Sequence, residues 1–290
     1  MKPAPFSYHR PRTRSEVDRL LAELGDEAKI LAGGQSLVPI LNMRLAAPAH
    51  LVDINHLTGE VDEPFADGDA LVVGPLVRHE ALERPGAVAD RVPLLRETVQ
   101  YVAHPAIRNR GTVVGSIAHA DPAAELPAAF AALGGEARAR SVRGSRSIPA
   151  SELFTSQLET SLEPGEWIEE VRIPCAPGAE GHAVEEFSRR HGDYAVCGVI
   201  ALANRNGDGA VAIALSFISM APIPERLELP LLTADEVAGS ALDGAVAAAV
   251  SDRLEPEADL QATVEYRTAL AERLGARAAR RAARMALEEG

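Results

Sequence analysis

Hydrophobic residues recur at helical spacing near the start of the chain and predict an amphipathic helix over residues 13–25. The apolar positions that share one face of this helix are Val17, Leu20, Leu21 and Leu24. Thr13 and Glu16 have the spacing of a capping box, and Gly25 suits the C-terminal end of a helix. The helix is therefore predicted to begin after its threonine and to end at its glycine.

Short apolar runs follow this helix and predict a small β-turn-α-β unit. Residues 29–32 and 50–54 read as strands, and residues 37–41 read as a helical turn between them. We assign this unit to residues 1–56.

The remaining pattern divides into two further blocks, at 57–176 and 177–290. In the first block the predicted elements are strands at 70–73 and 167–173 and helices at 93–101 and 125–133. In the second they are strands at 197–204 and 210–220, a hairpin turn at 206–209 between them, and helices from Thr233 to Gly290. The loop at 177–181 opens this last block.

Two glycine loops stand out against these elements. Ala32-Gly33-Gly34-Gln35-Ser36 follows the predicted strand at 29–32, and Gly111-Thr112-Val113-Val114-Gly115-Ser116 follows the predicted helix at 93–101. Such loops offer main-chain amides with little side-chain bulk, which is how backbone binds a diphosphate. A single loop of this kind can be an ordinary turn, but the pair predicts a large nucleotide cofactor held between them.

Composition and charge narrow the classes of function. The chain has 290 residues, 47% of them hydrophobic, and a net charge of −13, which argues against general binding to nucleic acid or to anionic membranes. No apolar stretch of about 18 residues exists, so no membrane span is expected. The polar start does not resemble a signal peptide. With two cysteines, Cys175 and Cys197, the simplest location is a reducing cytoplasm.

The C-terminal segment carries a cluster of basic residues: Arg273, Arg277, Arg280, Arg281 and Arg284. One interpretation is a docking surface for a partner subunit. The interpretation we prefer is a solvated helix whose apolar face enters the core through Leu270, Leu274, Ala278 and Met285.

Other candidate motifs are weaker. Gly207-x-Gly209 matches part of a dinucleotide fingerprint, but a strand follows it where a helix is needed, so a hairpin is expected. The pairs His119/Asp121 and His191/Asp193 lack further ligands at zinc-like spacing. They remain candidates for lining a ligand pocket, and no metal site is expected. No residue is assigned a catalytic role.

Three stretches carry a resemblance to a known family. They are Leu31–Pro39 followed by Met43–Ala46 and Asp53-Ile54, then His104–Pro127, then Glu186–Ala195. The chain resembles the FAD-binding medium subunit of molybdenum hydroxylases, such as the carbon monoxide dehydrogenase medium chain and the xanthine dehydrogenase FAD-binding subunit. The resemblance covers essentially the whole chain.

The resemblance implies an α+β, vanillyl-alcohol-oxidase-type (PCMH-like) fold. Two α/β subdomains, at 1–56 and 57–176, would hold an extended FAD, and a C-terminal domain of antiparallel strands and helices, at 177–290, would close over the flavin. The resemblance places Asp121 and Glu125 near the nucleotide and Tyr194 near the flavin ring. The full set of FAD-binding residues that it implies is Ala32, Gly33, Gly34, Gln35, Ser36, Leu37, Tyr101, Gly111, Thr112, Val113, Val114, Gly115, Ser116, Asp121, Glu125, Ile168 and Tyr194.

One residue departs from the family pattern. The second loop of the family usually reads Thr-[Ile/Val]-Gly-Gly, and Val114 replaces the first of those glycines. A valine restricts φ and adds two methyl groups where the backbone approaches phosphate. We therefore expect Val114 to keep a negative φ and to turn its side chain away from the cofactor.

The function implied by the resemblance is electron transfer. FAD on this chain would receive electrons from iron–sulfur clusters on a small [2Fe-2S] subunit, and a large molybdopterin-binding subunit would oxidise the substrate. The implied assembly is a dimer of heterotrimers. Two alternatives stay open: a flavin-free assembly or scaffold protein with this fold, and a stand-alone FAD oxidoreductase.

Overall fold

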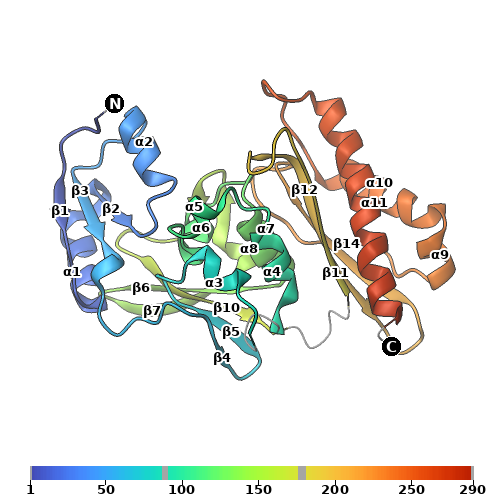
Figure 1. Ribbon diagram of the computed structural model, residues 1–290, viewed down its shortest axis with the longest axis horizontal. Helices are drawn as coiled ribbons and strands as arrows, with labels where there is room; N and C mark the ends of the chain where they lie inside the picture. The colour runs from blue at the N-terminus through green and yellow to red at the C-terminus, as the bar shows by residue number, and fades with distance from the viewer. Residues whose placement is uncertain (1, 87–90, 176–180, 289–290) are drawn as a thin grey trace.

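A computed structural model describes residues 2–86, 91–175 and 181–288 of the chain, with three main β-sheets arranged in a row (Figure 1). The N-terminal sheet is parallel, in the order β1 (Ser7–His9), β3 (His50–Asp53) and β2 (Ala28–Leu31). Its two α-helices are α1 (Arg14–Leu24) and α2 (Leu37–Met43), and the 3-10 helices are η1 (Gly25–Glu27) and η2 (Ile54–His56). Thr13 and Glu16 form the predicted capping box of α1, and Gly25 ends it.

The central sheet is antiparallel and carries most of its helices on one side (Figure 1). Its strands, in spatial order, are β4 (Phe65–Asp67), β5 (Ala70–Val73), β10 (Trp167–Pro174), β6 (Glu136–Ser141) and β7 (Gly144–Pro149). The helices of this layer are α3 (His79–Glu83), α4 (Pro93–Val99), α5 (Pro105–Arg108), α6 (Val113–His119), α7 (Glu125–Ala132) and α8 (Ala150–Leu153). A small hairpin, β8 (Phe154–Ser156) with β9 (Glu159–Thr160), accompanies them.

The C-terminal sheet is antiparallel and is covered on both faces. Its strands, in order, are β11 (Gly181–Ser188), β12 (Ala195–Arg205), β13 (Val211–Ile218) and β14 (Leu227–Glu228). Helices α4 and α7 of the central layer contact one face of this sheet. Helix α11 (Val264–Glu288) contacts the other face, and α10 (Ser240–Arg253) and α9 (Ala234–Ala238) pack against α11 (Figure 1). The first nine residues of β12 are consequently buried.

The long helix α11 confirms the preferred interpretation of the basic segment. Leu274 and Ala278 are buried in the C-terminal core, and Leu270 packs at its edge. Arg280 pairs with Asp243 of α10 at 2.8 Å, and Arg281 pairs with Glu97 of α4. Much of the basic charge is therefore used inside the molecule.

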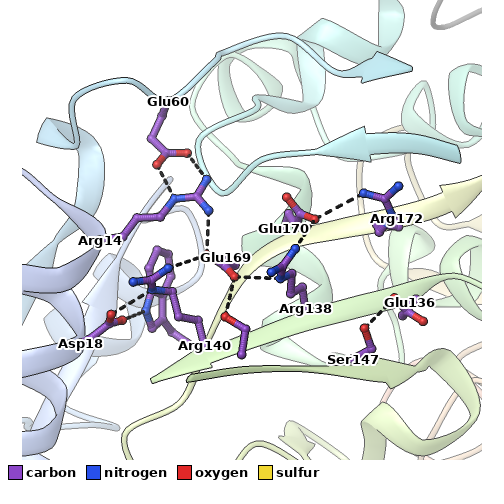
Figure 2. A network of polar contacts seen from close by, with 12 residues as sticks. Arg14, Asp18, Glu60, Glu136, Arg138, Arg140, Ser147, Glu169, Glu170 and Arg172 are labelled. Carbon is purple, nitrogen blue, oxygen red and sulfur yellow. Dashed lines mark hydrogen bonds and ion pairs between the residues drawn. The ribbon is translucent and has the colours of Figure 1, made fainter. Parts of the chain in front are cut away.

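A polar network fastens the N-terminal helix to the central sheet (Figure 2). Glu169 on β10, with only 2% of its surface exposed, accepts hydrogen bonds from Arg14 of α1 at 2.7 Å and from Arg140 of β6 at 3.3 Å. Asp18 of α1 accepts from Arg140 at 2.9 Å and from the Trp167 indole at 2.9 Å. These contacts fix the N-terminal layer relative to the central one.

The main predicted helices and strands are present, with one correction and several omissions. The second glycine loop was predicted as a loop, but Val113 to Ser116 form the first turn of α6, because the Thr112 side chain caps that helix. The elements that were missed are the strands β1, β4, β6, β7, β8, β9, β11 and β14 and the short helices α3, α5 and α8. Residues 177–180 of the predicted loop lie outside the described residues. The exact boundaries proposed at 56/57 and 176/177 remain a prediction. Across the three described segments, no helix is long and apolar enough to cross a membrane.

Candidate cofactor-binding site

The first glycine loop leaves β2 and turns into α2 with its amides free. Gly34 has a φ of +71°, a left-handed conformation that glycine adopts without steric cost. Within the described chain, the four amides of residues 33–36 donate no backbone hydrogen bond. Ser36 occupies the N-cap position of α2, but its side chain makes no capping hydrogen bond. Four donors and a hydroxyl are thus available to an anion.

The two glycine loops touch each other directly. A Cβ atom placed on Gly33 would lie 2.6 Å from the Arg110 carbonyl oxygen and 2.7 Å from Gly111 Cα. It would also lie 3.0 Å from the Thr112 amide nitrogen. Only glycine permits this approach of one main chain to another, so the loops, far apart in sequence, form one continuous surface of main chain.

The second loop is built around the cap of α6. The Thr112 hydroxyl accepts a hydrogen bond from the Gly115 amide at 3.1 Å, as an N-cap residue does. Val114 lies inside this first turn and is not among the residues with positive φ. Its side chain is buried in the central core with Val113 and Ile117. Val114 therefore keeps a negative φ and turns its side chain into the core, as expected.

His79 supports the second loop through two hydrogen bonds, and it was not identified as a site residue from the sequence. Its amide donates to the Gly111 carbonyl at 3.0 Å, and its ring Nε2 lies 2.9 Å from the Thr112 carbonyl. Because a carbonyl only accepts, Nε2 carries the proton. Burial, with smaller contributions from Arg108 and Arg78, lowers the pKa of His79 to about 4, so the ring stays neutral near pH 7.

A polar chain supports the first loop and was also missed. Tyr8 of β1 donates its hydroxyl hydrogen to Asp53 at the end of β3. Asp53 accepts from the Asn55 side chain at 2.6 Å, and Asn55 donates to the Ala32 carbonyl at 2.8 Å. Asp53 and Asn55 follow the carboxyl end of a strand in a parallel sheet, where ligand sites tend to form. Their position at the end of that strand was the signal in the sequence that could have identified them as site residues.

Of the three stretches that carry the family resemblance, the third (Glu186–Ala195) packs against the start of the second (His104–Pro127). Gly192 has a φ of +86°, and a Cβ on it would lie 2.4 Å from the His104 ring. The rings of His104 and His191 meet edge to face at 6.1 Å. The Ser219 amide, beside this loop, donates to the Pro122 carbonyl at 2.8 Å. The three stretches that carry the resemblance therefore converge at one place in the molecule.

Acidic side chains gather beside this junction. Glu125 begins α7 with 7% of its surface exposed, and Glu186 lies on β11 with a buried Oε2 that has no partner among the described residues. Burial raises the pKa of Glu125 to about 7, and burial plus the Glu125 charge raises the pKa of Glu186 to about 8. Tyr194 is 60% exposed, and partial burial of its side chain, followed by the Asp121 and Glu125 charges, raises its pKa.

The other sequence-predicted residues lie in different surroundings. Tyr101 is half-buried after α4, and its hydroxyl donates to the Val184 carbonyl of β11 at 3.3 Å. Ile168 is buried in the central core, where it pairs with Ala139 of β6. Leu37 is the first residue of α2. Asp121 uses one carboxylate oxygen to accept from the Ala123 amide at 2.9 Å.

These observations fit FAD better than a metal. The free amides of the first loop, and a Gly33 position where any side chain would collide with the main chain of the second loop, suit a diphosphate. Among the residues described, no group of three or more metal-ligating side chains is found.

Comparison with known protein families gives two matches that together span most of the chain. Residues 4–176 match the FAD binding domain in molybdopterin dehydrogenase, and residues 182–282 match the CO dehydrogenase flavoprotein C-terminal domain.

Individual relatives agree with these matches. The chain is 38% identical to the caffeine dehydrogenase subunit beta of a Pseudomonas species, over 98% of this chain and 96% of that one. It is 34% identical to the carbon monoxide dehydrogenase medium chain of Afipia carboxidovorans, over 97% and 98%. Among solved structures, quinoline 2-oxidoreductase from Pseudomonas putida 86 matches with a TM-score of 0.89 and 34% identity, covering 99% of this chain and 100% of the matched one. This solved structure, which matches over nearly the whole chain, bears out the expected fold class.

Proposed function

Because this chain belongs to the family of FAD-binding medium subunits of molybdenum hydroxylases, we propose that it transfers electrons from iron–sulfur clusters to an external acceptor through bound FAD. The chemistry that the flavin supplies is the exchange of electrons singly or in pairs. The observation that carries the proposal is the direct contact of the two glycine loops, which presents a single main-chain surface to one diphosphate.

The residues proposed to hold FAD divide by role. The amides of residues 33–36, the Ser36 hydroxyl and the start of α6 receive the diphosphate. Asp121 and Glu125 would lie by the nucleotide, and Tyr194, which is exposed and near the loop that packs on His104, would lie against the flavin. The proposal also includes the main chain around Ile168 and the half-buried Tyr101, as the family pattern implies.

The electrons are proposed to arrive from another subunit. The chain has only Cys175 and Cys197, fewer thiolates than one [2Fe-2S] cluster requires. Cys197 is fully buried in the C-terminal core, and burial raises the pKa of its thiol to about 12. We propose a small [2Fe-2S] subunit and a large molybdopterin-binding subunit as partners, in a dimer of heterotrimers.

Purification separates this function from its alternatives. The isolated chain should be yellow, or become so with added FAD. Co-expression with a molybdopterin-type chain and an eight-cysteine chain encoded beside it should give a complex that contains iron and molybdenum. A colourless chain that never binds FAD would contradict the proposal, and a yellow chain that oxidises a substrate alone would favour a stand-alone enzyme.

A further inference from the structure

Arg78 lies where the two glycine loops meet, and its side chain bridges them. It occupies the N-cap position of α3 and forms a β-bridge with Thr112. One guanidinium nitrogen, Nη1, donates to the Arg110 carbonyl, and the other, Nη2, donates to the Asn55 side-chain oxygen at 2.7 Å. Asn55 in turn donates to the Ala32 carbonyl. Arg78 therefore links the residue before the second loop directly, and the first loop through Asn55, by three hydrogen bonds in all.

The Arg110 carbonyl is also the atom that Gly33 approaches most closely. A Cβ on Gly33 would collide with the same oxygen atom that accepts from the Arg78 guanidinium, so the charge lies within about one Debye length of the first loop. An anion bound to the free amides of residues 33–36 would experience that charge.

Asp62, Asp53 and Glu80 act on the charge of Arg78 from a distance, but none of them pairs with it directly. Within the described ranges, no ion pair to Arg78 is found, and Asp53, the acidic residue of the supporting chain, is occupied by Tyr8 and Asn55. Burial and the neighbouring charge of Arg110 lower the pKa of Arg78. Arg84, on the same segment, contrasts with it, because it pairs with both Glu63 and Glu80. Among the described residues, the loop junction thus carries a guanidinium without a direct carboxylate partner, in a chain whose net charge is −13.

Building on the proposed function, we propose that Arg78 is the cationic residue of the FAD diphosphate site and that it holds the two glycine loops in register. Both roles follow from one guanidinium, whose planar fork bridges two acceptors while its charge remains available. A lysine at this position would keep the charge but could not span both acceptors in a fixed geometry.

Titration of the flavin-free full-length chain with FAD, ADP and riboflavin tests the assignment. Arg78→Gln should weaken FAD and ADP binding about 10- to 100-fold, because it removes a partly buried positive charge close to the bound diphosphate. Riboflavin has no phosphate, so its affinity should stay within about twofold. The decrease of FAD affinity with added salt should become shallower in Arg78→Gln and stay at the wild-type slope in Arg78→Lys. Arg78→Lys should still weaken FAD binding, because register is lost.

The matched control is Arg84→Gln, which removes the same charge from an exposed ion pair and should leave FAD affinity and its salt slope unchanged. An Arg78→Gln variant with wild-type FAD affinity, or with equal losses for FAD and riboflavin, would overturn the assignment. If Arg78→Gln fails to fold, Arg78→Lys decides: wild-type FAD affinity in that variant contradicts the register role, and an altered salt slope contradicts the charge role. Failure of the wild-type chain to bind FAD would instead contradict the proposed function.

Discussion

At the scale of single residues, Gly33 has the least freedom to change in the site. Its neighbours are main-chain atoms of residues 110–112, and main chain moves only with its whole loop. Gly33→Ala should therefore separate the two glycine loops, lower the free energy of unfolding by about 1–3 kcal/mol and weaken FAD binding about tenfold or more. Denaturant unfolding and FAD titration measure the two effects.

Gly207 is the matched control for this change. It lies in the β12–β13 turn, and a Cβ on it would meet nothing within 4 Å. Gly207→Ala should leave both FAD affinity and stability close to wild type. Equal behaviour of the two variants would show that the close contact at Gly33 has no influence on binding.

For Val114 we expect a change that affects stability but not FAD binding, because its side chain faces the core. Val114→Gly restores the family pattern, but it removes a buried side chain and places glycine in a helix. The free energy of unfolding should fall by about 2–4 kcal/mol, with FAD affinity of the folded chain changed by less than about threefold. Tighter FAD binding in the variant would show that the valine methyl groups impede the cofactor.

Some site residues could be predicted from sequence and others could not. The glycine loops were predicted because small residues beside a strand or a helix form a local pattern. Arg78 and His79 were missed, since an Arg-His pair after a strand has no periodic signature. Their roles arise from contacts with residues more than thirty positions later. Glu186 lies in the third stretch that carries the resemblance, but its raised pKa arises in part from Glu125 of α7, a neighbour that the local sequence does not reveal.

At the scale of elements, the predicted segments are those whose own sequence specifies them. Helix α1 has a capping box and one apolar face, and α9 has a second capping box from Thr233 and Glu236. Strand β6 was missed because its alternation is built from alanines and arginines, and alanine is a weak indicator of a strand. Those arginines are accommodated by Glu169 on the neighbouring strand β10, a partner that local sequence does not reveal.

The Glu169 network permits a test at this scale. Burial alone would raise the pKa of Glu169, but hydrogen bonds from Ser145 and Arg14 outweigh burial and hold the pKa below its ordinary value. Glu169→Gln leaves Arg14 and Arg140 partly buried without their shared carboxylate (Figure 2). The free energy of unfolding at pH 7 should fall by about 3 kcal/mol, measured by urea denaturation.

This loss should shrink in acid, because a depressed carboxyl pKa stabilises the fold only above the ordinary pKa near 4.5 and the benefit disappears as the pH falls. The control is Glu163→Gln, which removes an exposed pair with Arg143 and should cost less than about 1 kcal/mol. A Glu169→Gln variant as stable as this control would show that the network does not join α1 to the central sheet.

At the scale of the whole molecule, the central layer and the C-terminal sheet meet around buried acids. Glu186 of β11 faces Glu125 of α7, and the other titratable or charged groups that interact with it are Tyr101, Cys197 and, through Cys197, Arg267 of α11. Neither sheet alone buries this pair, so the raised pKa values are a property of their packing.

The resulting pH dependence has a definite sign. As the pH rises above the ordinary value of 4.5, the unfolded chain loses the Glu186 proton first, and the folded chain keeps it until about pH 8. The wild-type free energy of unfolding should therefore fall between these values and then level off. Glu186→Gln cannot ionise, so its loss of stability between pH 5 and pH 9 should be smaller by about 1–2 kcal/mol. Parallel pH profiles for the two proteins would contradict this prediction.

The meeting of Gly33 with residues 110–112 also limits how the chain can recover from damage. A clash between two side chains can be relieved by shrinking either one, so second-site suppressors arise on both sides. Here the opposing atoms belong to the peptide backbone, which every amino acid shares. A genetic selection that begins with any larger residue at position 33 should therefore return revertants at that codon, and no compensating change on the facing loop.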